Sequence, residues 1–297
     1  MKKRNLIKLV SACMSCLLLT TPLCSAVNTI KPNSKKENTK NTVLKVGGTI
    51  AGLVGLAALA GVLYNKFSSD TIKRNFLSFE GIHRTDYYHI SEQEIALLKK
   101  HVMVVQKSVV DKNFLRQIGS NGDTVVVNAA NSKGENGGGV CGTIFEEMGI
   151  GSTVPEVVKW MKKTGASEIG TGNVFIHLSY NLRTKMVKYV MQTVGPDFRE
   201  YSDKKEAYKK LYEAYYNTII LAALNGAKNV VMPAISMGIF KGEGYICHLI
   251  ALTAIADALN TLERWGIQIQ DFWVYLCDFL SGDEAKIFFD GCRNKLL

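Results

Sequence analysis

A glycine-rich segment in the middle of the chain carries residue types that could bind a phosphate group. It reads VVVNAANSKGENGGGVCG over residues 125–142, so that an apolar run leads through Asn131 to Gly137, Gly138 and Gly139 and then into a helical pattern. A helix start offers unpaired backbone N–H groups and the positive end of the helix dipole, and both favour an anion. The spacing differs from GxxxxGK[ST], and no lysine follows the last glycine, which disfavours a P-loop ATPase.

A second segment of the same kind lies about a hundred residues later. It reads MPAISMGIFKG over 232–242, again an apolar run followed by small residues before a helical pattern. Two such loops at one sheet edge could hold both phosphates of a diphosphate, and Phe240 could then pack against a sugar. The alternative for either loop is a glycine-rich connection without function. Three consecutive glycines immediately before a helix disfavour that alternative for the first.

The elements that must position these loops alternate between apolar runs and amphipathic stretches from His101 onward. Composition is that of a folded protein, with 47% apolar and 21% charged residues. Short β-branched runs predict strands at 101–107, 124–128, 173–178, 187–194, 229–232 and 272–277. Helical spacing predicts helices at 154–163, 203–224, 245–264 and 282–295. This alternation predicts a layered α/β domain with helices on both sheet faces and its site at the carboxyl ends of strands.

Several short segments resemble the hallmark segments of the macrodomain family. They are the NAAN-x5-GGGV stretch, Thr193-Val194-Gly195-Pro196 and PAISMGIF, with Thr171-Gly172-Asn173 and Tyr180-Asn181-Leu182 in fitting positions. The resemblance covers roughly residues 98–295. It implies a three-layer α/β/α fold with a mixed central sheet that binds ADP-ribose. Some members hydrolyse ADP-ribose from protein side chains or from O-acetyl-ADP-ribose, and others only bind it.

The resemblance also assigns expected roles. Asn131 would contact the distal ribose and help to position the attacking water, and Phe240 would lie at that ribose. We therefore treat Asn131, Phe240 and Cys141 as the catalytic candidates. The first phosphate loop would be formed by Gly137, Gly138, Gly139 and Val140, and the second by Ser236, Met237, Gly238, Ile239 and Phe240. Hydrolysis at the anomeric carbon passes through an oxocarbenium-like state, so the resemblance implies no cofactor and no metal.

Cys141 departs from the family pattern, because many hydrolytic members have aspartate at this place. A thiol at a helix start could act as a thiolate nucleophile, since the helix terminus lowers a thiol pKa. The simpler alternative is a small residue packed behind the loop, and it is favoured. The substitution leaves a hydrolase and a non-catalytic reader of ADP-ribose both open.

The residues expected to bind the adenine depart further from the family pattern. Ser108 and Val109 follow the first predicted strand where the family usually has Gly-Asp-[Ile/Val], and Asp111 comes three residues late. Cys277 stands where an aromatic residue often covers the adenine. Losing a charge-assisted hydrogen bond costs of order 1.5–3 kcal/mol, or roughly tenfold or more in affinity. A third possibility is therefore a degenerate macrodomain that serves as an interaction module at a membrane.

The basic charge of the chain is confined to its first quarter. Residues 1–74 carry twelve Lys or Arg and two acidic residues, a net charge of +10, whereas residues 75–297 carry 24 of each sign. This distribution favours a membrane partner and argues against nucleic acid. The basic, aromatic stretch 201–216 could suggest RNA, but its charges balance at a helical period, which predicts a solvated helix face.

The sequence of the first quarter predicts that the protein is exported and anchored to a membrane. Residues 1–26 resemble a bacterial secretory signal, 27–45 a polar linker, and 46–64 a transmembrane helix of nineteen uncharged residues. A buried core helix is the alternative for 46–64, but five glycines in such a helix would be unusual. Residues 65–97 would form a helical neck before a macrodomain at 98–297. We expect a bacterial membrane-anchored protein whose domain faces a cytoplasm.

Overall fold

The computed structural model describes residues 75–78, 90–119 and 122–277. The chain divides into two units, 1–69 and 70–297, and all described residues belong to the second. The expected signal segment, linker and transmembrane helix, together with the expected last helix at 282–295, lie outside the described residues. The described fold is therefore that of the second unit alone.

In the described part of the chain, seven strands form one mixed sheet in the order β1-β4-β5-β3-β6-β7-β2. The strands are β1 Phe76–Leu77, β2 Val102–Val105, β3 Thr124–Ala130, β4 Val174–Leu178, β5 Val187–Val194, β6 Asn229–Pro233 and β7 Trp273–Cys277. The five strands from β5 to β2 in this order run parallel, and β4 is antiparallel to both of its neighbours. The mixed central sheet expected from the sequence is thus present.

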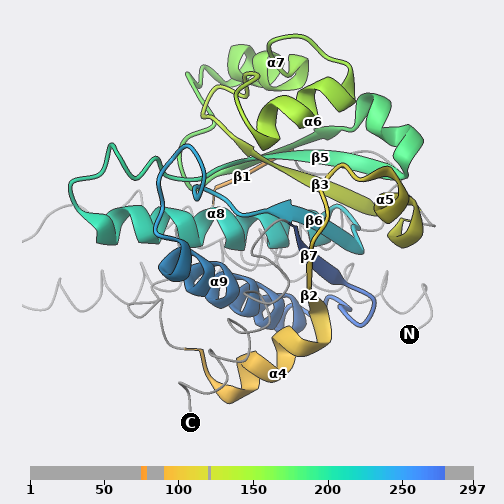
Figure 1. Ribbon diagram of the computed structural model, residues 1–297, viewed down its shortest axis with the longest axis vertical. Helices are drawn as coiled ribbons and strands as arrows, with labels where there is room; N and C mark the ends of the chain where they lie inside the picture. Colours follow the sequence, from red (N-terminus) through yellow and green to blue (C-terminus); the bar gives the residue numbers. More distant parts are fainter. Residues whose placement is uncertain (1–74, 79–89, 120–121, 278–297) are drawn as a thin grey trace, which may run out of the picture. The chain divides into compact units, whose positions relative to one another are not determined.

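Helices cover both faces of the sheet (Figure 1). On one face lie α5 (Lys112–Ile118), α6 (Val140–Met148) and α7 (Pro155–Thr164), which bury Leu115, Phe145 and Val157 against Val126 and Val190 of the sheet. On the other lie α8 (Lys204–Leu224) and α9 (Gly244–Arg264), with α4 (Glu92–His101) packed on α9. A 3-10 helix, η2, spans Tyr180–Lys185. The three-layer arrangement agrees with the predicted fold class.

Local sequence explains where these helices begin and end. Ser91 and Glu94 form a capping box at the start of α4, with the Ser91 hydroxyl accepting from Glu94 N at 3.3 Å. Asp203 caps α8 by accepting from Lys205 N at 2.8 Å. Pro155 occupies the first turn of α7, and Gly165 ends that helix in a left-handed conformation.

Several elements differ from the predictions. Residues 76–77, expected in a helical neck, form a strand that pairs with β4, and α4 extends to His101 within the same unit. The solvated helix face expected over 201–216 is confirmed only at the start of α8, where Lys204, Lys205 and Glu206 are exposed, because every residue from Leu211 to Leu224 is buried. Charges are paired within the helix, as Lys210 Nζ lies 2.9 Å from Glu213 Oε2, and this pairing permits the burial.

One helix of the described residues is long and apolar enough to cross a membrane by length and composition. It is α9, and 78% of its most apolar window is buried inside the domain. A core helix of an α/β sheet has this same composition, because it packs on the sheet with one side and on neighbouring helices with the others. The position of α9 against α8 and α4 agrees with that role.

Candidate functional site

The two glycine-rich loops lie at the same edge of the sheet. β3 and β6 are parallel neighbours, so both loops leave the carboxyl ends of adjacent strands. The chain order reverses here, since β3 has β5 on one side and β6 on the other, and such switch points are the usual ligand sites of α/β sheets. A Cβ atom placed on Gly138 would lie 3.2 Å from Ile239 Cδ1. The two loops therefore touch.

Asn131 organises the first loop. Its Oδ1 accepts from the backbone N–H groups of Lys133 at 3.2 Å and Glu135 at 3.0 Å, and its Nδ2 donates to Glu135 O at 2.9 Å. One amide hydrogen of Asn131 remains without a partner among the described residues. The side chain is half-buried, so this hydrogen is available to a ligand beside the loop.

The triple glycine begins α6 with a conformation that other residues avoid. Gly139 is the N-cap at φ 63° and ψ −136°, and no side chain caps the helix. Gly137, Gly138 and Gly139 are exposed, and Val140 is half-buried as the first helical residue. The first N–H groups of α6 are therefore not occupied by a side-chain cap, which leaves them open to an anion.

The second loop turns sharply at Ser236. This residue has φ 66°, and its backbone carbonyl accepts from Gly242 N at 2.9 Å. Its hydroxyl is buried without a hydrogen-bond partner among the described residues, directly over Gly195, where a Cβ would lie 2.2 Å from Ser236 Oγ. The Tyr215 hydroxyl of α8 accepts from Ile235 N at 2.8 Å, and burial raises the pKa of that tyrosine. The loop is thus held on rigid elements.

Met237, Gly238, Ile239 and Phe240 complete that loop at the surface. Ile239 is 56% exposed although it is aliphatic, and Met237 and Phe240 are half-buried. Phe240 is fixed through its backbone, because Phe198 N donates to Phe240 O at 2.9 Å. The structure therefore brings the residues predicted for both phosphate loops to one place.

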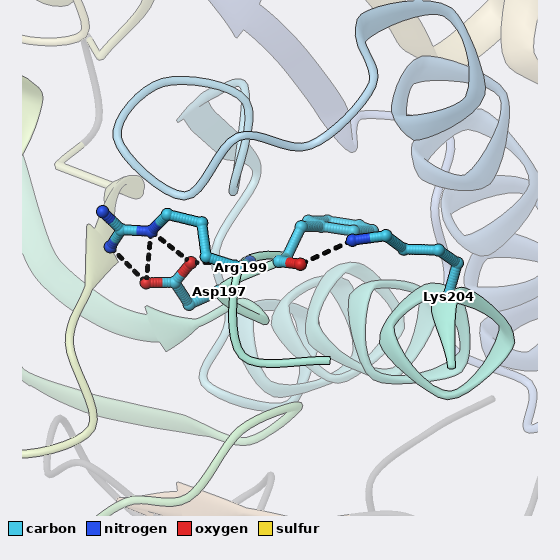
Figure 2. A network of polar contacts seen from close by, with 4 residues as sticks. Asp197, Arg199 and Lys204 are labelled. Carbon is cyan, nitrogen blue, oxygen red and sulfur yellow. Dashed lines mark hydrogen bonds and ion pairs between the residues drawn. The ribbon is translucent and has the colours of Figure 1, made fainter. Parts of the chain in front are cut away.

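A polar network supports Phe198 from the segment between β5 and α8 (Figure 2). Lys204 Nζ donates to Phe198 O at 2.6 Å and lies 5.6 Å from the centre of the Phe198 ring. Arg199 and Asp197 form an ion pair beside it, and this hydrogen bonding lowers the pKa of Asp197. These residues had no role in the sequence prediction. Their only signal was a cluster of charges after Gly195-Pro196.

Cys141 is buried beneath the first loop, with 6% of its surface exposed. Its Sγ lies 3.3 Å from Asn128 Nδ2 and 3.6 Å from Glu135 O. The sulfur therefore has a donor on one side and an acceptor on the other. This position agrees with a residue packed behind the loop, the alternative favoured from the sequence, more than with an exposed nucleophile.

Three buried polar side chains extend from Cys141 across the sheet, and sequence reasoning missed them. Asn128, Gln192 and His177 lie on β3, β5 and β4, and each is fully buried. Register places Asn128 opposite Gln192 on adjacent strands. The signal was present as a polar residue with a side-chain amide or imidazole inside each of three largely apolar strands, but only the strand order reveals that they meet.

The adenine candidates lie at the same edge, beyond β7. Val105 at the end of β2 pairs with Cys277 at the end of β7, which places Ser108 and Val109 just past that edge. Ser108 is exposed, whereas the Val109 side chain is 2% exposed and belongs to the core. Asp111 caps α5 by accepting from Phe114 N at 2.7 Å through Oδ1, so one oxygen of its carboxylate is already used. Ser108 is one of the polar residues exposed there, together with Gln106 and Lys107.

Metal-binding chemistry finds no support among the residues that the structure describes. No group of three His, Cys, Asp or Glu side chains gathers there with the geometry of a metal site. His101 is buried and contacts Phe272 O through Nδ1 at 2.9 Å, which is a structural role.

Comparisons with known proteins agree with this geometry. A family model described as the Macro domain matches residues 127–248. An uncharacterised protein of Fusobacterium nucleatum is 39% identical over 142 residues, which cover 47% of this chain and 71% of the relative. An O-acetyl-ADP-ribose deacetylase of Escherichia fergusonii is 34% identical over 138 residues, covering 46% of this chain and 72% of the relative.

A solved structure shares the fold. The Oceanobacillus iheyensis macrodomain with ADP aligns at a TM-score of 0.50 and 22% identity, over 66% of this chain and 90% of that one. With the mixed sheet, the two touching loops and the sequence relatives, this likeness leads to one conclusion. The chain belongs to the macrodomain family.

Proposed function

We propose that this protein binds ADP-ribose at the two loops and hydrolyses an ADP-ribosyl linkage. The observation that carries the proposal is the contact between Gly138 and Ile239, which joins two phosphate-type loops beside Asn131. The N–H groups at the start of α6 and the backbone of the second loop would hold the diphosphate. The distal ribose would then lie between Asn131 and Phe240.

The hydrolysis depends mainly on the position of the attacking water. Cleavage at the anomeric carbon develops oxocarbenium character, so a water held in line needs little activation by a strong base. The amide hydrogen that Asn131 does not use within its loop would orient the ribose or this water. No ionised side chain of the described residues is required at that point. The substrate class is ADP-ribose joined to a protein side chain or to an acetyl group.

The test compares three proteins with two substrates. The full chain, Asn131→Ala and Asn131→Asp are incubated with mono-ADP-ribosylated protein and with O-acetyl-ADP-ribose, and the release of ADP-ribose is measured. Asn131→Asp keeps an oxygen for the N–H groups of Lys133 and Glu135 but removes the amide donor and with it the bond to Glu135 O, whereas Asn131→Ala removes all three bonds. We expect both variants to lose at least about tenfold in turnover, which corresponds to about 1.4 kcal/mol in the barrier. Full activity in Asn131→Ala would refute the proposed role.

The buried position of Cys141 favours a second candidate, a reader that binds ADP-ribose without turnover. No acid stands where many hydrolytic relatives of this family have one, and the thiol is enclosed by Asn128 and Glu135. Binding of ADP-ribose without release of product from either substrate would support the reader. Recovery of turnover in Cys141→Asp would then show that the missing carboxylate is the cause.

We further propose that the protein is anchored to a membrane through residues 46–64, with the macrodomain facing a cytoplasm. The support for the anchor is the uncharged apolar stretch that follows the basic linker, and the support for the orientation is that ADP-ribose is mostly an intracellular ligand. The flanking charges give only a weak bias and mildly oppose this orientation, with five lysines before the stretch and three basic residues after it. A reporter fused to the C-terminus should be active in the cytoplasm, and the chain should sediment with membranes after a carbonate wash. Activity of the reporter outside the cytoplasm alone would contradict this orientation.

A further inference from the structure

A continuous chain of buried hydrogen bonds runs across three strands of the sheet. Asn128 Nδ2 lies 2.7 Å from Gln192 Oε1, and Gln192 Nε2 lies 2.8 Å from His177 Nε2. His177 Nδ1 lies 2.8 Å from Leu178 O. Asn128, Gln192 and His177 are each 0% exposed, so the two contacts between their side chains are shielded from water, and the contact to Leu178 O is partly buried.

The last acceptor, Leu178 O, determines which group donates and which accepts in every hydrogen bond of the series. Leu178 O can only accept, so His177 Nδ1 carries the hydrogen and His177 Nε2 accepts from the Gln192 amide. Gln192 Oε1 then accepts from Asn128. Burial lowers the pKa of His177 to about 4, so the ring is neutral at pH 7, as this order requires.

This series of hydrogen bonds ends at the loop of Asn131. The second amide hydrogen of Asn128 points to Cys141 Sγ at 3.3 Å, and the thiol reaches Glu135 O at 3.6 Å. The same carbonyl accepts from Asn131 Nδ2 at 2.9 Å. Cys141 and Asn131 therefore share one acceptor, and a shift of either donor changes the environment of the other.

We propose that Asn128, Gln192 and Cys141 are positioning residues that hold the amide of Asn131 in its ligand-binding orientation. The inference rests on the proposed function, because Asn131 is the residue positioned. Cys141 acts as a neutral thiol that accepts from Asn128 and donates to Glu135 O. A thiolate would lose that donor and face a carbonyl oxygen, so the geometry disfavours it.

The orientation of Asn128 supports a role beyond packing. Its Oδ1 is buried and has no hydrogen-bond partner among the described residues, which is a destabilising arrangement for a core side chain. An apolar residue in this place would avoid that loss. The amide is instead oriented so that its two hydrogens are donated to Gln192 and Cys141, and its own oxygen has no hydrogen-bond partner among the described residues.

The first experiment compares Cys141→Ala with Cys141→Ser by titration of the full chain with ADP-ribose and by turnover. Alanine removes the donor to Glu135 O, and we expect binding and kcat to fall roughly fivefold, the loss typical of one neutral hydrogen bond. Serine keeps a donor and an acceptor and should recover most of that loss. A nucleophilic Cys141 predicts instead that serine is as inactive as alanine, and that result would overturn the proposal.

The second experiment interrupts the series of hydrogen bonds at Gln192, at a distance from the loop of Asn131. Gln192→Met keeps the side-chain volume but removes both hydrogen bonds of Gln192, and Thr193→Val is its matched control. Thr193 lies on the same strand and bonds Thr218 Oγ1 at 2.8 Å on the opposite face of the sheet. Both variants should lower the melting temperature, and only Gln192→Met should weaken ADP-ribose binding. Equal binding in the two would overturn the proposal.

A ligand-free readout separates failure of this inference from failure of the proposed function. The side-chain amide of Asn131 gives its own NMR signal, and its hydrogen exchange reports how firmly it is held. Gln192→Met should speed that exchange relative to Thr193→Val. If the wild-type chain does not bind ADP-ribose, the proposed function fails while this comparison still decides the positioning. Unchanged exchange in Gln192→Met would refute it.

Discussion

Asn131 has little freedom in this structure, because both ends of its amide bond to the backbone of its own loop. Its oxygen holds Lys133 and Glu135, and its nitrogen holds the Glu135 carbonyl. The residue type at this position was informative from the sequence, since asparagine both accepts and donates. The hydrogen bonds of Asn128, Gln192 and Cys141 that lead to its loop were not predictable, because they depend on which strands become neighbours.

The triple glycine offers a prediction at the residue scale. Gly139 and Gly226 both have positive φ and open space where a Cβ would be added, but only Gly139 begins α6. Alanine at either place should destabilise the fold by about 1–3 kcal/mol through backbone strain. Gly139→Ala should in addition weaken ADP-ribose binding about tenfold or more, because the N–H groups at the helix start are displaced.

Calorimetric titration of both variants, together with thermal unfolding, checks this pair. Gly226 follows α8 at the opposite edge of the sheet, so its variant measures strain without a change at the loops. Equal loss of affinity in Gly139→Ala and Gly226→Ala would mean that the start of α6 has no special part in binding.

At the scale of elements, the strands were the best predicted part of the fold. The runs VVV in β3 and VVM in β6 are buried on both faces, and their short length and β-branched residues favour strands over helices. β1 has two residues and α5 has seven, too few for a periodic pattern to stand out. The burial of α8 was missed because paired charges resemble a solvated face when only one helix is considered.

The connection between β5 and α8 supports the second loop, and this leads to an element-scale prediction. Lys204→Met removes the bond from the Lys204 ammonium to Phe198 O, and Phe198 in turn holds Phe240. We expect a stability loss of about 1 kcal/mol and a few-fold weaker affinity for ADP-ribose. Lys205→Met is the matched control, because Lys205 bonds Asp203 through its backbone N–H, which the substitution keeps.

Urea unfolding and ligand titration of the two lysine variants provide the measurement. The account predicts that Lys205→Met behaves as the wild type in both. A Lys204→Met variant with wild-type affinity would show that the second loop keeps its position without the network in Figure 2.

On the scale of the whole molecule, the buried His177 should make stability depend on pH. Desolvation lowers its folded pKa from 6.5 to about 4, although Glu156 and the hydrogen bond to Leu178 O oppose this shift. The nearby Tyr180 hydroxyl bonds Glu156, and burial raises the pKa of that tyrosine. Between these pH values the unfolded chain binds one more proton than the folded chain. Stability therefore falls as the pH falls from 6.5 to 4.

The expected loss is up to about 3 kcal/mol from this histidine. Urea unfolding of the full chain at a series of pH values measures it, and His177→Gln provides the comparison because glutamine keeps an acceptor for Gln192 without titrating. The variant should show a flatter dependence between pH 6.5 and 4. An identical dependence in both proteins would place the titrating group elsewhere.

The uneven charge of the chain also belongs to this scale. Its macrodomain region is neutral, and its first 74 residues carry the entire net charge of +10. We propose that the basic first quarter anchors the chain to a membrane and that the neutral macrodomain region binds the ligand there. The residues that would anchor it lie outside those described, so that part stays a prediction from composition and hydropathy.

Binding of ADP-ribose is best measured by calorimetric titration of the full chain, with Asn131→Ala as the control. We expect a single site with micromolar affinity, about 8 kcal/mol of binding free energy, and a loss of at least tenfold in the variant. Absence of binding at millimolar ADP-ribose by a chain shown to be folded would contradict this expectation. The changes at Ser108 and Cys277 would then have removed the nucleotide site from this macrodomain.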